Sequence, residues 1–443
     1  MDDSRTGRTM KGDDMSNRVV FLLPGQGAYV PGVFARLGTD ADLISDCVAE
    51  MDATAEEFGY RPVRPLLFSY DAPAMGSLLK SDHERLDVAT LATSIAFPRL
   101  LAEKWGIRPD HVLGHSLGEF AALAIAGVFT PADATRAVCE RHAALRKSPP
   151  AGGMLALNVD AARAEELITA ADAHAVAVSA HNSPEQTVIS GDEADLTKVQ
   201  KIAEDQGIRR SRLRIASAFH VPQLAVAADL YAVTLREVPW SAPREGVYYS
   251  HALGRYLTAA DDVVDLMVTD MTRPVRFHQA VRSLHDDGAM TFLQCGALDT
   301  LTKLVSATVP SATTVAPLCA AVSVAELTDL LGPLASATAS AGLSAPANGS
   351  PVDLDRQILE TVRAVCAETL EYPIDVITDD ADFTADLGAD SLTLNEMLER
   401  ALQRYGLEDH FHEGDPAGYP TVADLTTFVA GLVRERDAAA GQR

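Results

Sequence analysis

The stretch PDHVLGHSLGEFAALAIAGVF, residues 109–129, decides the fold of this chain. Its first part predicts a strand, its last part predicts a helix, and GHSLG at 114–118 predicts a sharp turn between them. The two glycines are needed because side chains at these positions would collide with neighbouring backbone in a strained turn. Such a turn exposes the Ser116 hydroxyl at a helix N-terminus, where the amide of Leu117 can stabilise an oxyanion. The alternative is a chance Gly-Ser-Gly turn, and the flanking strand and helix argue against it.

The sequence around this stretch indicates an α/β domain over residues 18–334. VVFLLPGQG at 19–27 predicts a strand that ends in a glycine-rich turn, and 85–105 predicts a helix. Residues 150–216 differ, because short apolar runs alternate there with amphipathic helical patterns. They predict a small α+β subdomain that is inserted into the larger domain.

Three further segments complete the predicted organisation. Residues 1–17 are polar and predict a flexible tail. Residues 335–350 contain no charge and no aromatic side chain, and they predict a linker. Residues 351–443 carry 20 acidic residues against 7 arginines and no lysine, and show only helical periods. They predict a separate, acidic helical bundle.

Composition limits the possible functions. A chain of 443 residues is too long for one core, so at least two domains are expected. The formal charge of -25 disfavours binding to nucleic acid. No apolar run reaches the roughly 20 residues that span a bilayer, and no signal-type segment begins the chain, so we expect a cytoplasmic protein without membrane contact. The five cysteines lack CxxC spacing and predict buried thiols rather than a metal site.

A serine hydroxyl needs a base within hydrogen-bond reach before it can attack a carbonyl group. His220 is the best candidate, since it lies where the predicted subdomain returns to the large domain and loops at such junctions line clefts. His115 is the competitor. Neighbours in a tight turn point in different directions, so we expect His115 to line the site.

Six motifs then occur in an order and spacing that resemble the acyltransferases of fatty acid and polyketide synthesis. They are PGQG at 24–27, GHSLGE at 114–119, Arg141, HNSPEQTVISG at 181–191, SAFH at 217–220 and RPVRF at 273–277. From about residue 18 to residue 330 the chain resembles a malonyl-CoA:acyl carrier protein transacylase. The resemblance implies a large α/β-hydrolase-like domain with an inserted ferredoxin-like subdomain.

The resemblance also implies roles for residues of the dyad. Ser116 would be the acylated nucleophile, and His220 would act first as general base and then as general acid. The amides of Gln26 and Leu117 would form the oxyanion hole. The donor would be an acyl-CoA.

The acyl group is implied by a further set of residues. Arg141 would pair with the free carboxylate of a malonyl group, which suits the planar two-bond fork of a guanidinium. Phe219, His115 and Asn182 would also line the substrate site. The glutamine that the family holds in the helix before Trp105 is replaced in this sequence, and we predict Val88 as the equivalent residue.

DLGADSL at 386–392 resembles the phosphopantetheine attachment motif of acyl carrier proteins. On physical grounds alone, Asp390 and Ser391 before LTLNEM predict a helix N-cap. The resemblance adds that Ser391 would carry a covalent 4'-phosphopantetheine, attached by a phosphopantetheinyl transferase.

The resulting hypothesis is an acyltransferase fused to a carrier protein, in polyketide, fatty acid or related biosynthesis. It would move an acyl group, malonyl in the first place, from CoA through Ser116 to the pantetheine thiol of its own or a separate carrier. A ketosynthase-containing synthase would be a partner. The alternatives are a proofreading thioester hydrolase of the same fold, a transacylase for a non-malonyl group, and a non-catalytic docking module.

Overall fold

The chain divides into two compact units, Met1–Leu343 and Ser344–Arg443. The structure is a computed structural model. It describes residues 18–213, 215, 217–320, 323–341, 351–370, 377, 383, 391–405, 407 and 421–440. The predicted tail at 1–17 lies outside the described residues.

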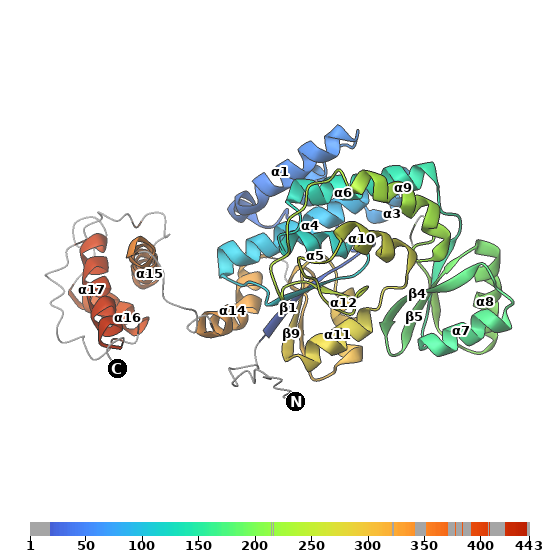
Figure 1. Cartoon of the computed structure of the whole chain (residues 1–443). Helices are drawn as coiled ribbons and strands as arrows, with labels where there is room; N and C mark the ends of the chain where they lie inside the picture. Colours follow the sequence, from blue (N-terminus) through green and yellow to red (C-terminus); the bar gives the residue numbers. More distant parts are fainter. Residues whose placement is uncertain are drawn as a thin grey trace, which may run out of the picture. The chain divides into compact units, whose positions relative to one another are not determined.

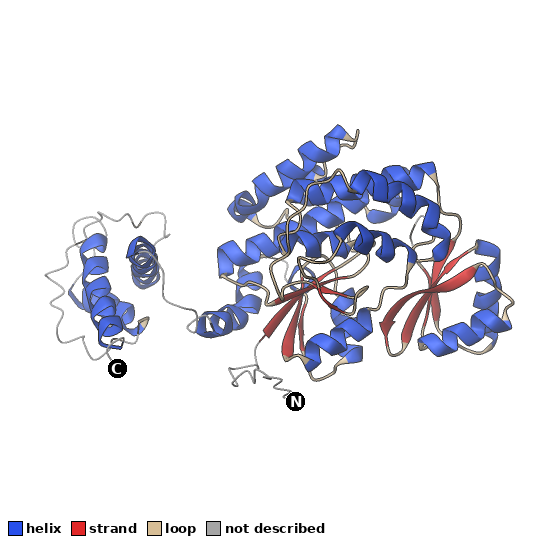
Figure 2. Ribbon diagram, viewed as in Figure 1, coloured by secondary structure: helices blue, strands red, loops and turns tan. Residues whose placement is uncertain are grey.

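A parallel sheet forms the centre of the first unit (Figures 1 and 2). Its strands, in spatial order, are β10 (Thr313–Val315), β9 (Ala289–Gln294), β1 (Arg18–Leu23) and β2 (His111–Gly114). β1 pairs in parallel with both β2 and β9, and its residues from Val19 to Leu23 are fully buried. A strand that is covered on both faces needs a continuous apolar run, which explains the sequence VVFLL.

Helices pack on the sides of this sheet (Figure 1). They are α1 (Asp42–Glu57), α2 (Arg64–Phe68), α3 (Met75–Ser81), α4 (His83–Trp105), α5 (Gly118–Ile125), α6 (Pro131–Lys147), α9 (Ala225–Leu235), α10 (Val263–Thr272), α11 (Phe277–Asp286), α12 (Thr300–Thr308), α13 (Pro317–Ala320) and α14 (Val324–Ala341). Two short 3-10 helices cover Gly38–Ala41 and Pro222–Leu224, and a small hairpin joins β7 (Tyr249–Ser250) to β8 (Arg255–Tyr256). The strand, turn and helix predicted over 109–129 are β2, the turn at 114–118 and α5.

The inserted subdomain is an antiparallel sheet that carries two helices (Figure 1). Along the chain its elements are β3 (Gly153–Leu157), α7 (Ala161–Ala170), β4 (Val176–Ser183), β5 (Gln186–Gly191), α8 (Glu193–Asp205) and β6 (Arg210–Arg212). Its spatial order is β4-β5-β3-β6. This βαββαβ order confirms the predicted ferredoxin-like subdomain. α7 and α8 pack on the sheet, while β4 also contacts α11 and α12 of the large domain.

The second unit contains three described helices, α15 (Pro351–Leu370), α16 (Ser391–Gln403) and α17 (Val422–Ala440). Their apolar side chains form a core of their own, with Val362, Leu398 and Val429 at its centre. This agrees with the predicted helical bundle.

Two details differ from the sequence predictions. α14 continues to Ala341, so the first part of the predicted linker is helical, because alanine and serine permit a helix when preceding turns are already formed. Residues 342–350 lie outside the described residues.

Four cysteines are buried, but Cys319 is exposed on the short surface helix α13, so the prediction of five buried thiols is wrong at that position.

Candidate active site

The turn at 114–118 holds Ser116 in a strained backbone conformation, with φ of 56°. A serine rarely adopts this left-handed region, and such residues are found where the surrounding structure enforces them. The amide of Glu119 donates to the carbonyl of Ser116 at 2.9 Å, which begins α5 directly after the turn. The turn therefore places the hydroxyl of Ser116 at the N-terminus of α5.

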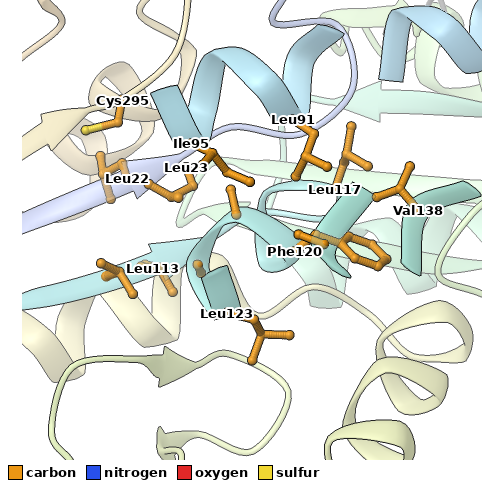
Figure 3. Packing of buried hydrophobic residues seen from close by; sticks show 14 of the residues in the cluster. Leu22, Leu23, Leu91, Ile95, Leu113, Leu117, Phe120, Leu123, Val138 and Cys295 are labelled. Atoms are coloured by element: carbon orange, nitrogen blue, oxygen red, sulfur yellow. The ribbon is translucent and has the colours of Figure 1, made fainter. Parts of the chain in front are cut away.

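Close packing explains the glycines of the turn. A Cβ added at Gly118 would lie 1.9 Å from the carbonyl oxygen of Leu23, at the end of β1. A Cβ added at Gly114 would lie 2.5 Å from the amide nitrogen of Glu119. Leu117, Phe120 and Leu123 anchor the start of α5 in the core, where they lie beside residues of the neighbouring strands and helices (Figure 3).

Ser116 and His220 lie within hydrogen-bond reach, although 104 positions separate them. The distance from Ser116 Oγ to His220 Nε2 is 2.7 Å. His220 Nδ1 lies 2.6 Å from the backbone carbonyl oxygen of Asp270, to which it donates. Because Nδ1 carries the proton, Nε2 is free to accept the serine proton. Burial lowers the pKa of His220, and the nearby Asp270 only partly opposes this, so the ring is neutral and can act as a base.

Behind His220 lies a group of buried ionisable side chains that the sequence reasoning missed. Asp270 Oδ1, on α10, is 3.8 Å from His220 Nδ1 and 3.2 Å from His251 Nε2. Burial acts to raise the pKa of Asp270, but His220 and His251 outweigh it and the pKa is lowered. Asp270 is therefore a negative charge that can stabilise a protonated His220.

Glu119 lies at the far side of this group. It is fully buried and accepts a hydrogen bond from the hydroxyl of Tyr248. Burial and repulsion by Asp270 raise the pKa of Glu119, so this carboxyl group is neutral. The group thus holds one negative charge, on Asp270, beside the candidate base.

His115 contacts Asn182 and Phe277 rather than the hydroxyl of Ser116. Its Nε2 lies 2.8 Å from Asn182 Oδ1, and its ring packs edge-on against Phe277. Burial lowers the pKa of His115 to about 4. Both His115 and Asn182 line the cavity at Ser116.

The candidate oxyanion donors lie on two loops that approach each other closely. Neither the amide of Leu117 nor that of Gln26 donates to any residue that the structure describes. Gly25 approaches the turn so closely that an added Cβ would lie 2.6 Å from the carbonyl oxygen of His115. The PGQG loop is thereby pressed against the serine turn, and two amides remain available near Ser116.

A cavity of about 200 Å³ opens at Ser116 and His220. The large domain supplies Gln26, Thr300 and Leu304, and the face of the small sheet that α7 and α8 do not cover supplies Met154 and Val188. The cavity lies between subdomain and large domain, a common position for small-molecule sites. Its walls are mainly apolar.

Arg141 has a different environment from the one predicted. It lies on α6, is 4% exposed and does not line the described part of the Ser116 cavity. Its Nη2 is 3.4 Å from Asp87 Oδ2 on α4. Val88, the predicted equivalent of the family's glutamine, lies next to Asp87 on α4 and is fully buried in the hydrophobic core. One residue along a helix turns the side chain by about 100°, and Asp87 has the position that faces Arg141.

The second unit offers one candidate residue. Ser391 is the first residue of α16, and the preceding residues of the DLGADSL motif lie outside the described part. A helix N-terminus of this length suits a phosphate, because the first amides and the helix dipole both favour negative charge. The start of α16 is thus compatible with the attachment site that the DLGADSL motif predicts at Ser391.

Within the described residues, no helix combines the length and the apolar character needed to cross a membrane. Nor does any cluster of three or more described His, Cys, Asp or Glu side chains form a candidate metal site.

Comparison with known proteins identifies the class to which this fold and site belong. The acyl transferase domain family matches residues 20–333, and the phosphopantetheine attachment site family matches residues 360–429. The chain therefore belongs to the acyl transferase domain family and carries a phosphopantetheine attachment domain. It is an acyltransferase of the polyketide synthase type.

The curated relatives are large synthases. The chain is 32% identical over 279 residues to polyketide synthase GfsA of Streptomyces halstedii, covering 63% of this chain and 4% of the synthase. It is 30% identical over 285 residues to a phenolphthiocerol synthesis polyketide synthase, Pks15/1, of Mycobacterium marinum, covering 63% of this chain and 13% of the synthase. Across the relatives compared, the chain spans between 4% and 15% of their length.

Solved structures share the fold of the first unit. Malonyl-CoA:acyl carrier protein transacylase (FabD) of Xanthomonas oryzae pv. oryzae is 26% identical, with a TM-score of 0.60 and coverage of 68% of this chain and 94% of that protein. The acyl transferase domain of SpnD, solved with 2-(pent-4-yn-1-yl)malonyl, is 28% identical, with a TM-score of 0.62 and coverage of 74% and 78%. These likenesses confirm the predicted acyltransferase fold.

Proposed function

We propose that the acyltransferase works through an acyl-enzyme on Ser116, with His220 as its base. The observation that carries this proposal is the 2.7 Å contact between Ser116 Oγ and His220 Nε2 in a turn whose backbone strain exposes the hydroxyl. The neutral state of His220 and the two available amides near Ser116 support it.

In the first half-reaction, His220 Nε2 takes the proton of Ser116 Oγ as that oxygen attacks the thioester carbonyl. The oxyanion of the tetrahedral intermediate is stabilised by the amides of Gln26 and Leu117, and the imidazolium of His220 by Asp270. The intermediate then collapses, the C–S bond breaks, and His220 returns its proton to the departing CoA thiolate. The product is an ester on Ser116.

In the second half-reaction, His220 removes the proton of an acceptor thiol, whose sulfur attacks the ester. The bond to Ser116 Oγ breaks, and His220 returns the proton to Ser116. Ser391 would hold a phosphopantetheine, which supplies a thiol of this kind when it is attached. The chain's own carrier domain or a separate carrier protein is the acceptor in this scheme.

The partners follow from the same chemistry. Attachment at Ser391 needs a phosphopantetheinyl transferase, and an acyl-CoA supplies the group. The likeness to polyketide synthases favours a ketosynthase-containing synthase as the consumer of the loaded carrier. A cytoplasmic location remains our prediction.

Two acyl classes remain candidates. Malonyl is the group that the resemblance implies, and several solved neighbours are named malonyl transacylases. The resemblance implied that Arg141 would pair with the free carboxylate of a malonyl group. Arg141 already has a carboxylate partner in Asp87, at 3.4 Å, and this contact favours a non-malonyl group.

The test is acylation of the full chain by individual acyl-CoAs, followed by intact-protein mass spectrometry. Ser116→Ala should lose the acyl mass gain on the first unit, whereas Ser77→Ala, which removes an exposed hydroxyl outside the cavity, should retain it. Persistent acylation of the first unit in Ser116→Ala would refute the proposal.

A thioester hydrolase is the second class to separate. The acyl-enzyme of a transferase should be stable in water and should discharge when a pantetheine thiol is added. Rapid loss of the acyl mass without any thiol acceptor would instead assign a hydrolase.

A further inference from the structure

The Asp87 carboxylate forms the centre of a buried polar cluster beside the acyl cavity. Its Oδ2 accepts from Gln26 Nε2 at 2.7 Å and from His142 Nε2 at 3.0 Å, and it lies 3.4 Å from Arg141 Nη2. Asp87, Arg141 and His142 are each less than 5% exposed. No role was assigned to Asp87 or His142 by the motifs of the sequence.

The charges of this cluster cancel. Arg141 is positive. Burial acts to raise the pKa of Asp87, but His142 and Arg141 outweigh it and lower the pKa, so the carboxylate is negative. Burial lowers the pKa of His142, so its ring is neutral. A buried guanidinium needs a compensating charge, and the protein itself provides one.

Arg141 is also held away from the acyl cavity. Its guanidinium carbon lies 5.0 Å from the ring centre of Phe120 and 5.9 Å from that of Phe219. Phe219 lines the cavity at Ser116, whereas Arg141 does not line its described part. Phe219 is therefore a neighbour of both the acyl cavity and the cation.

Asp87 lies close to the wall of that cavity. A small neighbouring pocket is lined by Asp87 and Leu86, and it shares Gln26, Gly27 and Ile215 with the cavity at Ser116. Gln26, which lines the cavity, donates to Asp87, so a carboxylate bound in the cavity against Gln26 would lie close to the negative charge of Asp87. Like charges brought together in a closed site repel strongly, whereas an uncharged acyl group leaves the neutral cluster unchanged.

We propose that Asp87 neutralises Arg141 and makes this acyltransferase select acyl groups without a free carboxylate. Asp87 is thus a residue that determines specificity, and the substrate class is an uncharged acyl thioester such as acetyl or propionyl. This inference depends on the proposed acyl-enzyme at Ser116, because it concerns the group that Ser116 receives.

The test compares acetyl-CoA, propionyl-CoA and malonyl-CoA as donors to the unmodified full chain, with single-turnover loading of Ser116 followed by intact mass. The wild-type chain should load acetyl or propionyl faster than malonyl. Asp87→Asn keeps the shape of the side chain and removes its charge, so the malonyl-to-acetyl rate ratio should rise by about tenfold or more. Asp87→Gln should change the ratio in the same direction.

Asp229→Asn is the matched control, because Asp229 is exposed on α9 and the substitution changes the net charge equally. Its ratio should equal that of the wild type. Faster loading of malonyl by the wild-type chain would overturn the inference, as would an unchanged ratio in folded Asp87→Asn and Asp87→Gln. If neither variant folds, the malonyl-to-acetyl rate ratio of the wild-type chain alone decides whether the inference holds. Absence of any acyl group on Ser116 would instead refute the proposed function.

Discussion

Asp270→Asn separates the two contributions that Asp270 makes to His220. The backbone carbonyl of Asp270 accepts from Nδ1 at 2.6 Å, and the substitution leaves this hydrogen bond in place. The tautomer of His220 is therefore retained. Only the negative charge, 3.8 Å from Nδ1, is removed.

The size of the effect follows from that distance. Two unit charges 3.8 Å apart attract by about 4 kcal/mol at an effective dielectric constant near 20, which corresponds to roughly a 1,000-fold change in an equilibrium constant. His220 is only partly protonated in the transition state, so acylation should slow by about 10- to 1,000-fold.

The pH dependence should change as well. Burial already lowers the pKa of His220, and Asp270 opposes that shift. Without the carboxylate the pKa should fall further. Because the neutral ring is the base, the acylation rate rises as the pH increases through this pKa, and the rising limb of the profile should move to lower pH.

Quenched-flow acylation with intact-mass detection measures both quantities. Asp265→Asn is the control, because Asp265 is an exposed acid on the same helix, α10. Circular dichroism checks that each variant is folded. An unchanged rate and pH profile in folded Asp270→Asn would show that the backbone carbonyl alone prepares His220.

Three further results are expected. His115→Ala should slow acylation by less than about tenfold, because its Nε2 contacts Asn182 rather than Ser116 and loss of a true general base costs about 100-fold or more; a larger loss would favour His115 as the base. Ser391→Ala should abolish the mass gain from a phosphopantetheinyl transferase and leave acylation of Ser116 intact, and a variant that is still modified would point to another residue. Gly118→Ala should lower the free energy of unfolding by about 3 kcal/mol or more in chemical denaturation, because its Cβ would meet the carbonyl oxygen of Leu23 at 1.9 Å; wild-type stability would contradict the tight turn.

Local sequence determined the main elements of the fold. The strand, turn and helix over 109–129 depend on neighbouring residues, since apolar runs, glycine spacing and helix periodicity act within a few positions. The ferredoxin-like subdomain followed from the resemblance and is confirmed. The predicted start of the linker, at residue 335, was wrong, because composition alone did not reveal that α14 continues to Ala341.

The candidate site was only partly accessible from the sequence. Ser116 is set by its own turn, and His220 was chosen for its position at the junction of the subdomain. The structure brings the two within 2.7 Å. Asp270 had no local signal, because it lies 50 residues after His220 and acts through a contact that exists only in the folded chain.

The surroundings of Arg141 show most clearly which features depend on the sequence alone and which depend on the tertiary structure. The sequence by itself determined that an arginine stands at position 141 and that a helix covers 85–105, and the resemblance implied that this helix borders the site. Only the tertiary structure decided that Asp87 contacts Arg141. The reason is that a one-residue step along a helix rotates the side chain by about 100°, and the packing of α4 against α6 selects which side chain is turned inward.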